Sequence, residues 1–529
     1  MYSLRNRRGV VLVMTMIVFA VLATWVVSIS SMCNTNIQLA HNQHKVNSAL
    51  SAAESSLECG RYIVANTLSL LPSTGYNYVT TSDADTAWAI LCEQVQAQPW
   101  VNDGAQQTAD EIITPTTSYS QDCGAFKIRF YRENTHTVRL EGIGTDGDVT
   151  RRVSLQMDIT KDGKVMNYAI ASRGRMWLTG ESTIYGDIFS DWDRADISPF
   201  NMTSDSRVEG TINTVLTLEE IQDEGAFQLE TLDEDGNPIF DEEGNRIYSE
   251  EDEIQGYHEG INYGQENTDM PGMDISHYNT DLYYDMVING DGNGDISSSS
   301  TIQTEYFPHA AGDYTQPKYG SSRRLDRHVY ENQTFTDQRL PDNRNALFKN
   351  CTFQGVLYID CSKSGSDYYN NVRFEDCTFN GPIVTDVPQQ FKWQNNCLYF
   401  TGEATFDNTS DIQEATILAP HFNVNLGNTN PVQSDNNVLT GAIVGGIVDV
   451  RGNAQIYGTI ISMCDTTGWS SGYVTNIGAT LNDGGSETTE LGDVGVISIR
   501  PEKEMMLPSG ITSPIVIKLL QETYSEGFN

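Results

Sequence analysis

The hydrophobic positions at the start of the chain fall into two successive patterns. The segment Val10–Ile29 is uncharged and almost wholly apolar. About 20 such residues, at about 1.5 Å per residue, cross the ~30 Å hydrocarbon core of a bilayer as a helix. After this segment, apolar residues recur at steps of three, four and seven, as on one face of a helix. These residues are Val46, Leu50, Ala53, Leu57, Val64, Leu68 and Leu71. Because no proline precedes Pro72, the patterns predict one unbroken transmembrane and amphipathic helix over 10–71.

The charges beside the apolar segment predict its orientation. Three arginines precede it, and Glu54 is the first acidic residue of the chain. Basic residues stay on the cytoplasmic side of a membrane, so we expect everything after Ile29 to be translocated. A cleaved signal peptide and an uncleaved signal anchor are alternatives. The apolar run is longer than the 7–15 residues usual for a signal peptide, and the amphipathic pattern continues out of it.

Two short motifs frame this helix and carry a resemblance to a known family. Arg7-Arg8-Gly9 precedes the apolar run, and Ala52-Ala53-Glu54-Ser55-Ser56-Leu57 lies in the amphipathic part. This order resembles the amino terminus of PilX-type minor pilins and related pseudopilins. The resemblance implies a prepilin-like leader over 1–9, cleavage after Gly9 and N-methylation of Val10. It also implies a bacterial inner-membrane location, and it places the family signature on Ala52, Ala53, Glu54 and Leu57.

One position departs from the major pilins of this family. They carry a glutamate five residues into the mature chain, where this sequence has Met14. That glutamate pairs with the terminal amine of a neighbouring subunit. Its loss favours a minor subunit over one that builds the bulk of a filament.

Alternating patterns follow the long helix. Thr86–Gln98 predicts a short helix that ends at Pro99. Three runs then alternate in side-chain type and are separated by polar turns, which predicts an antiparallel meander. The runs are Phe126–Arg132, Thr137–Gly142 and Arg152–Ile159. A helix stripe followed by such a sheet is typical of an α+β head, here over 72–162.

Internal repeats dominate the rest of the chain. The segment LFKNCTFQGVLYID at 347–360 matches RFEDCTFNGPIVTD at 373–386 with an offset of 26 residues, and Asn396–Phe400 begins a third copy. The segment LTGESTIYGDIFS at 178–190 likewise matches VRGNAQIYGTIIS at 450–462. Short β repeats with glycine turns predict a solenoid in which like residues stack. We expect an all-β, right-handed parallel β-helix, with its first rungs at 163–215 and its main part at 346–500. A β-sandwich is the alternative.

An acidic insertion is expected over 216–345. The stretch from Glu219 to Glu259 is dense in carboxylates, with Arg246 as its only arginine or lysine, which predicts an exposed hairpin or loop. Asn289, Asp291, Asn293 and Asp295 partly resemble a calcium loop, although its twelfth position is Ser300 instead of glutamate. Calcium is therefore a weak candidate ligand, and we expect no other cofactor.

The overall charge limits the classes of partner. The chain has 71 acidic and 32 basic residues, a formal net charge of −39. Nucleic-acid binding requires lysine and arginine to neutralise phosphates, so that class is excluded. A highly charged surface of one sign keeps a protein soluble and can attract divalent cations.

Two further site predictions are weaker. Asp360 and Asp386 occupy equivalent positions in the repeat, so their carboxylates would approach as an acid–base pair if the solenoid were catalytic. More commonly, aspartate at a strand end caps a turn, and we therefore expect no enzyme. Among the nine cysteines, Cys92 and Cys123 are the candidate disulfide.

The C-terminal segment 501–529 completes the prediction as a cap. Ser513–Tyr524 has the start signals and apolar spacing of a short helix, which would cover an open end of the solenoid.

Together these patterns predict a membrane-anchored minor pilin or pseudopilin-like subunit of a type IV pilus or a type II secretion-like filament. It would display the β-helix outside the cytoplasm, on a pilus or cell surface, for adhesion or partner binding. Its partners would be other pilins, a prepilin peptidase, the inner membrane and a polysaccharide or cell-surface ligand. A surface-tethered polysaccharide lyase or hydrolase and a non-filament scaffold on an uncut anchor are the alternatives.

Overall fold

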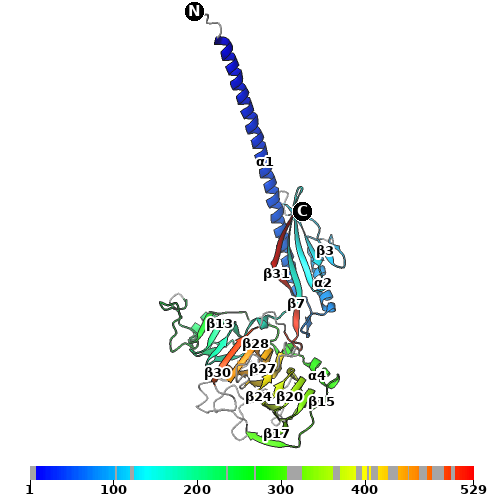
Figure 1. Ribbon diagram of the computed structural model, residues 1–529, viewed down its shortest axis with the longest axis vertical. Helices are drawn as coiled ribbons and strands as arrows, with labels where there is room; N and C mark the ends of the chain where they lie inside the picture. Colours follow the sequence, from blue (N-terminus) through cyan, green and yellow to red (C-terminus); the bar gives the residue numbers. More distant parts are fainter. Residues whose placement is uncertain are drawn as a thin grey trace, which may run out of the picture. The chain divides into compact units, whose positions relative to one another are not determined.

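The computed structural model divides the chain into two compact units. One, the head unit, comprises Met1–Pro72, Val79–Thr160 and Ile515–Asn529; the other, the stack unit, comprises Ser73–Tyr78 and Lys161–Pro514. Figure 1 traces both. The structure describes residues 7–101, 104–118, 124–233, 236–266, 270–306, 324–361, 370–388, 396–401, 404–406, 415–426, 439–450, 452–463, 474–478, 494–501 and 507–528.

Helix α1 (Arg7–Leu68) is unbroken over 62 residues, as the hydrophobic pattern predicts. At 1.5 Å per residue it is about 93 Å long. It ends three residues before the predicted end at Leu71. Figure 1 shows its amino-terminal half extending away from the sheet of the head unit.

The head sheet is antiparallel and contains the predicted meander. Its strands are β2 (Gln106–Gln107), β3 (Glu111–Ile113), β4 (Thr117–Ser118), β5 (Ala125–Arg132), β6 (Thr137–Asp146), β7 (Val149–Lys161) and β31 (Ser513–Phe528), ordered β31-β7-β6-β5-β3-β2 with β4 beside β5. Helix α2 (Thr81–Gln96) begins five residues before its predicted start, where Thr80 and Asp83 form a capping box.

The prediction of a C-terminal helical cap is wrong. Residues Ser513–Phe528 form β31, which lies next to β7 in the head sheet. Its direction is opposite to that of β7, because Gln156 contacts Thr523 while Asp162 contacts Pro514. Ile515 and Ile517 are buried in the head core, whereas Lys518 is exposed. The β-branched Ile-Val-Ile run therefore follows the two-residue period of a strand.

The stack unit consists mainly of parallel strands joined into successive rungs, each rung being one turn of chain. β1 (Ser73–Thr74) pairs with the start of β31. The stack strands are β8 (Ile170–Ser172), β9 (Arg175–Leu178), β10 (Ser182–Ile184), β11 (Ile188–Ser190), β12 (Phe200–Met202), β13 (Arg207–Thr214), β14 (Tyr257–Asn262), β15 (Gly294–Asp295), β16 (Ile302–Tyr306), β17 (Arg324–Glu331), β18 (Thr334–Leu340), β19 (Ala346–Lys349), β20 (Thr352–Ile359), β21 (Asn370–Glu375), β22 (Thr378–Phe379), β23 (Ile383–Thr385), β24 (Asn396–Thr401), β25 (Thr405–Phe406), β26 (Ala415–Leu426), β27 (Leu439–Val450), β28 (Gly452–Ser462), β29 (Val474–Ile477) and β30 (Val494–Arg500).

The predicted register at an offset of 26 residues is confirmed. Phe348 pairs with Phe374, and Phe353 pairs with Phe379, in parallel strands. The partial third copy continues the stack, because Phe374 pairs with Phe400. Like residues therefore lie above like residues along the core of the stack.

The spatial order of the rungs differs from their order in the sequence. One column of parallel strands runs β17, β19, β21, β24, β26, β27, β29, β9 and β12. The first rung in sequence thus stacks on the last, and Ile460 pairs with Ile170. Strand β30 likewise pairs with β10. The chain therefore enters and leaves the stack in neighbouring rungs. The rung at the start of the column, which contains β17, comes from the middle of the sequence.

This order explains the second sequence repeat. Ile456 and Ile184 lie in one column with Ile499 between them. Ile460 and Ile188 lie in another, with Ile170 between them. The matching segments are equivalent rungs, separated by one further rung.

The predicted acidic insertion is narrower than 216–345. Its end is a rung of the stack, because β17 and β18 pair in parallel with β19 and β20. Near its start, β14 pairs in parallel with β13. Helix α3 (Leu218–Glu224) lies between these parts, and α4 (Asp281–Ile288) packs against β18 and β20.

Candidate functional site

The amino-terminal half of α1 is the first part of the candidate site. Every described side chain from Val10 to His44 is exposed, including the whole predicted span Val10–Ile29. By length and composition α1 is able to cross a membrane. Because none of the described residues covers these large apolar side chains, this surface is suited to contact with lipid or with other protein chains.

The start of the helix includes the predicted processing position. The helix begins at Arg7, so Gly9 and Val10 are already helical. Met14 is exposed, and no carboxylate occurs before Glu54. From Val10 to Ile29, α1 thus presents an uncharged surface.

The second half of α1 packs on the head through a narrow stripe of small residues. Four of its smallest buried members are Ala49, Ala53, Ser56 and Gly60. The predicted residues Ala53, Leu57 and Val64 are buried in the same stripe, whereas Val46, Leu50 and Leu68 lie at its margins. The face of the helix is as predicted, but its closest contact is made by small residues.

Two glycines of β6 explain why small residues are needed there. A Cβ atom at Gly144 would collide with backbone atoms of Ala49 and Ala53, and one at Gly142 would collide with Ala53 and Ser56. The helix and the strand therefore approach backbone to backbone. Sequence reasoning missed these glycines, although two glycines on one face of a strand indicate a close approach.

The family signature lies at this contact. Ala52, Ala53 and Leu57 are buried against the head, and Glu54 is exposed. The apolar signature residues therefore have a packing role here, and only the glutamate is available to solvent or to another molecule.

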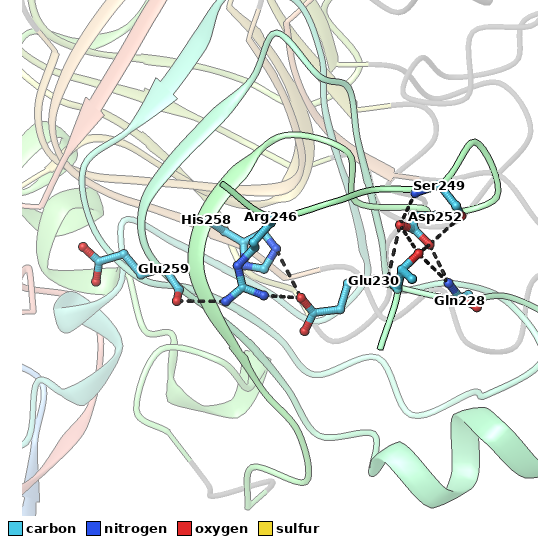
Figure 2. A network of polar contacts seen from close by, with 8 residues as sticks. Gln228, Glu230, Arg246, Ser249, Asp252, His258 and Glu259 are labelled. Atoms are coloured by element: carbon cyan, nitrogen blue, oxygen red, sulfur yellow. Dashed lines mark hydrogen bonds and ion pairs between the residues drawn. The ribbon is translucent and has the colours of Figure 1, made fainter. Parts of the chain in front are cut away.

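The acidic segment contains a buried polar network, which Figure 2 shows. Arg246, expected to be exposed, donates to the Glu230 carboxylate and to the Glu259 carbonyl oxygen. His258 Nε2 lies 3.8 Å from the same carboxylate. Burial raises the pKa of Glu230 and lowers the pKa of His258 to about 4.

A second centre in this network is Asp252. Its buried carboxylate accepts from Gln228 Nε2 at 2.6 Å and from the Ser249 backbone N–H at 2.7 Å. The Asp241 carboxylate accepts from the backbone N–H of Asn245 in a tight turn, and the Asp233 carboxylate likewise accepts from the backbone N–H of Asn237. The segment therefore contains hairpin turns, as predicted, but the buried ion pair between Arg246 and Glu230 holds it against the rest of the unit.

The two candidate catalytic aspartates occupy equivalent positions, as predicted. Asp360 N donates to Leu340 O, and Asp386 N donates to Ile359 O, both at 3.0 Å. However, both carboxylate oxygens of Asp360 accept from Arg339, at 2.8 and 2.7 Å. One guanidinium therefore engages both oxygens of this buried carboxylate.

Three of the four calcium candidates are engaged in protein contacts. Asn293 Nδ2 donates to Thr336 O at 2.7 Å, and Asp295 accepts from Arg339 at 2.9 Å. Asn289 donates to Asp285, and Asp291 is exposed. Within the described part of the chain, no group of three or more His, Cys, Asp or Glu side chains is arranged to hold a metal ion.

The stack buries an arginine, and α2 buries one cysteine of the predicted disulfide. Arg327 is wholly buried in the stack and donates to Asn371 Oδ1 at 2.5 Å, so it does not face a ligand from solvent. Cys92 is buried in α2, and its pKa is raised to about 12 by burial. Cys123 lies outside the described residues.

No family model matches the chain, and no curated protein matches it. Among solved structures, the chain is similar to the competence-associated pilin ComZ from Thermus thermophilus. The two are 12% identical, the alignment covers 92% of this chain and 98% of that chain, and the TM-score is 0.26.

Proposed function

We propose that this chain is a minor pilin or pseudopilin-like subunit of a type IV pilus or type II secretion-like filament. The observation that carries the proposal is the division of α1. Its front half is exposed and apolar, and its rear half packs on an antiparallel sheet through small residues. Such a helix can sit in a bilayer before assembly and pack against the same part of other subunits afterwards.

The PilX-type assignment and the minor role extend this proposal. The order of Arg7-Arg8-Gly9, the apolar run and the Ala52–Leu57 signature supports the first. The uncharged Met14 supports the second, because it offers no carboxylate to a neighbour's terminal amine. The arginines before the span favour an inner-membrane anchor with the bulk of the chain outside the cytoplasm.

We further propose that the stack unit is a right-handed parallel β-helix displayed for adhesion or partner binding. Parallel strands joined within one sheet cross over right-handedly in about 98% of cases. Repeated rungs offer long, regular side surfaces, which suit a polysaccharide or a cell-surface ligand. The ion pair between Asp360 and Arg339 favours this binding role over a lyase or hydrolase.

Intact-mass measurement of the mature protein tests the filament assignment. The full-length chain is expressed with a prepilin peptidase, beside Gly9→Leu and a control, Met14→Leu, that leaves the cleavage position intact. We expect wild type and the control to lose residues 1–9 and to gain one methyl group on Val10. We expect Gly9→Leu to keep its leader.

A leader that is not cleaved would support the alternative of a non-filament scaffold. A wild-type chain that keeps residues 1–9 and an unmethylated terminus would be a scaffold on an uncut anchor. Protease protection of intact cells tests the orientation separately: digestion of the stack unit from outside the inner membrane agrees with the proposal, and full protection contradicts it.

A further inference from the structure

Two buried cysteines occupy the same position in neighbouring rungs. The pairs Lys349–Glu375 and Thr352–Thr378 bracket them in register, so Cys351 lies opposite Cys377. Each is 1% exposed. Neighbouring strands lie about 4.8 Å apart. This spacing falls inside the range of about 4.4–6.8 Å that disulfides span between Cα atoms.

The two thiols also contact each other. A hydrogen bond between them lowers the pKa of Cys351 and raises the pKa of Cys377. Each thiol also donates to a backbone carbonyl of the preceding rung, Cys351 to Tyr330 O and Cys377 to Phe348 O, so the two side chains lie in one column of the core.

We propose that Cys351 and Cys377 are a disulfide site that covalently joins two rungs of the stack. The reaction requires a disulfide donor, such as oxidised glutathione. One thiolate attacks the donor and forms a mixed disulfide, and the second thiolate then displaces the remaining donor sulfur. Two cysteine thiols are oxidised, the donor is reduced to two thiols, and the two cysteine protons pass to them.

The burial of both sulfurs indicates when the bond forms. A donor cannot reach thiols that are 1% exposed in the folded stack. The bond therefore closes while the rungs are still assembling, or during local opening of the stack. Once closed, the same burial protects it from reduction.

The next rung provides a matched control. Cys397 is equally buried, but its stacked neighbours are Asn371 and Asn423. It is as deeply buried as the pair, but no cysteine lies opposite it in either neighbouring strand, and its sulfur accepts from Asn425 Nδ2 at 3.2 Å. We therefore expect Cys397 to remain a thiol under conditions that oxidise the pair.

Peptide mapping of the full-length chain tests the proposal, and it is independent of the membrane anchor and of the filament. The chain is purified in detergent under reductant and incubated with excess oxidised glutathione at temperatures up to the onset of unfolding. Free thiols are then alkylated in denaturant. Trypsin cuts after Lys349, Lys363 and Arg373, so the two cysteines lie on different peptides. Fragmentation distinguishes Cys351 from Cys361, which shares its peptide.

We expect a Cys351–Cys377 cross-linked peptide that disappears on reduction and on substitution of either residue by serine. Cys397→Ser should retain it, and the oxidised chain should unfold at higher denaturant concentration than the reduced chain. Recovery of both cysteines fully alkylated from oxidised wild type would overturn the proposal. So would a mixture of pairings like that of a chain oxidised in full denaturant. Both outcomes are read on wild type, so they hold even if a serine variant fails to fold.

Discussion

Phe348 stacks on Phe374 of the next rung, with ring centroids 5.6 Å apart and ring planes 12° from parallel. The column continues to Tyr330 on one side and Phe400 on the other. A second column of Phe335, Phe353, Phe379 and Phe406 runs beside it, and rings of the two columns meet edge to face. The core of this part of the stack is thus a double column of aromatic rings.

The first prediction concerns the centre of that double column. Phe374 is wholly buried, so Phe374→Ala should lower the free energy of unfolding of the stack unit by about 3–5 kcal/mol. Denaturant unfolding of the full chain measures the change. Phe240→Ala is the control, because Phe240 is 52% exposed and should change stability little. Equal effects of the two variants would contradict the stacked core.

The second prediction concerns the contact between α1 and β6. Gly144→Ala adds a methyl group that meets backbone atoms of α1, so it should destabilise the head by about 1–3 kcal/mol. Hydrogen exchange in α1 and β6 should become faster. Gly527→Ala in β31 is the matched control, since its nearest neighbour would lie 3.9 Å away. An unchanged exchange pattern in Gly144→Ala would mean that the helix does not pack as described.

A third prediction follows from His258. Its pKa is lowered to about 4 by burial, from about 6.5 in the unfolded chain, so the unfolded state binds more protons between these values. The stability that neutral His258 contributes is present above pH 6.5 and is lost as the pH falls through 4. The raised pKa of Glu230 acts in the opposite direction near its own titration.

The measurement is the slope of stability against pH. Wild type should lose stability between pH 6.5 and 4, by no more than about 3 kcal/mol from this residue. His258→Gln should reduce the slope. His41→Gln, which changes an exposed histidine of α1, should leave it unchanged. A slope that is the same in all three chains would show that His258 does not titrate as a buried group.

The fourth prediction concerns Arg339. Arg339→Gln leaves the buried Asp360 carboxylate without its cation and should destabilise the stack unit by about 3–5 kcal/mol. Arg207→Gln removes an exposed ion pair with Glu209 and should change stability by less than about 1 kcal/mol. Restoration of stability in Arg339→Gln/Asp360→Asn would assign the loss to the unpaired carboxylate.

The fifth prediction concerns calcium. Because Asn293 and Asp295 are already engaged, millimolar calcium should leave the melting temperature of the stack unit the same as in a chelator. A rise in melting temperature that Asp291→Asn abolishes would instead support the calcium loop.

Repetition made part of the fold predictable. Residues that stack on their own kind leave a fixed offset in the sequence, and the CTF motif at Cys351 and Cys377 revealed it. The rung at 324–340 lacks that motif, so Tyr330 and Phe335 were missed, although both belong to the aromatic columns. The register of the rungs can thus be predicted from the sequence where the same residue types repeat. It cannot be predicted where only the size and polarity of the side chains repeat.

Other features depend on contacts between distant segments. The pairing of Ile170 with Ile460 cannot be read from the local pattern of either segment. The apolar spacing of the short C-terminal run predicts a helix, because its pairing with the distant strand β7 leaves no sign in the local pattern. The side chains that hold Asp360 and Glu230 are separated from them in sequence, so the ion pairs of Arg339 and Arg246 were also missed.

The stack begins and ends in neighbouring rungs, and its two ends meet where the backbone N–H of Asp162 donates to Pro514 O at 2.9 Å. The stack strands β8 to β30 are consequently an insertion in the connection between β7 and β31. Evolution can lengthen, exchange or remove such an insertion without changing the two head strands that flank it. A tight two-residue turn in place of the insertion would still allow β31 to pair with β7.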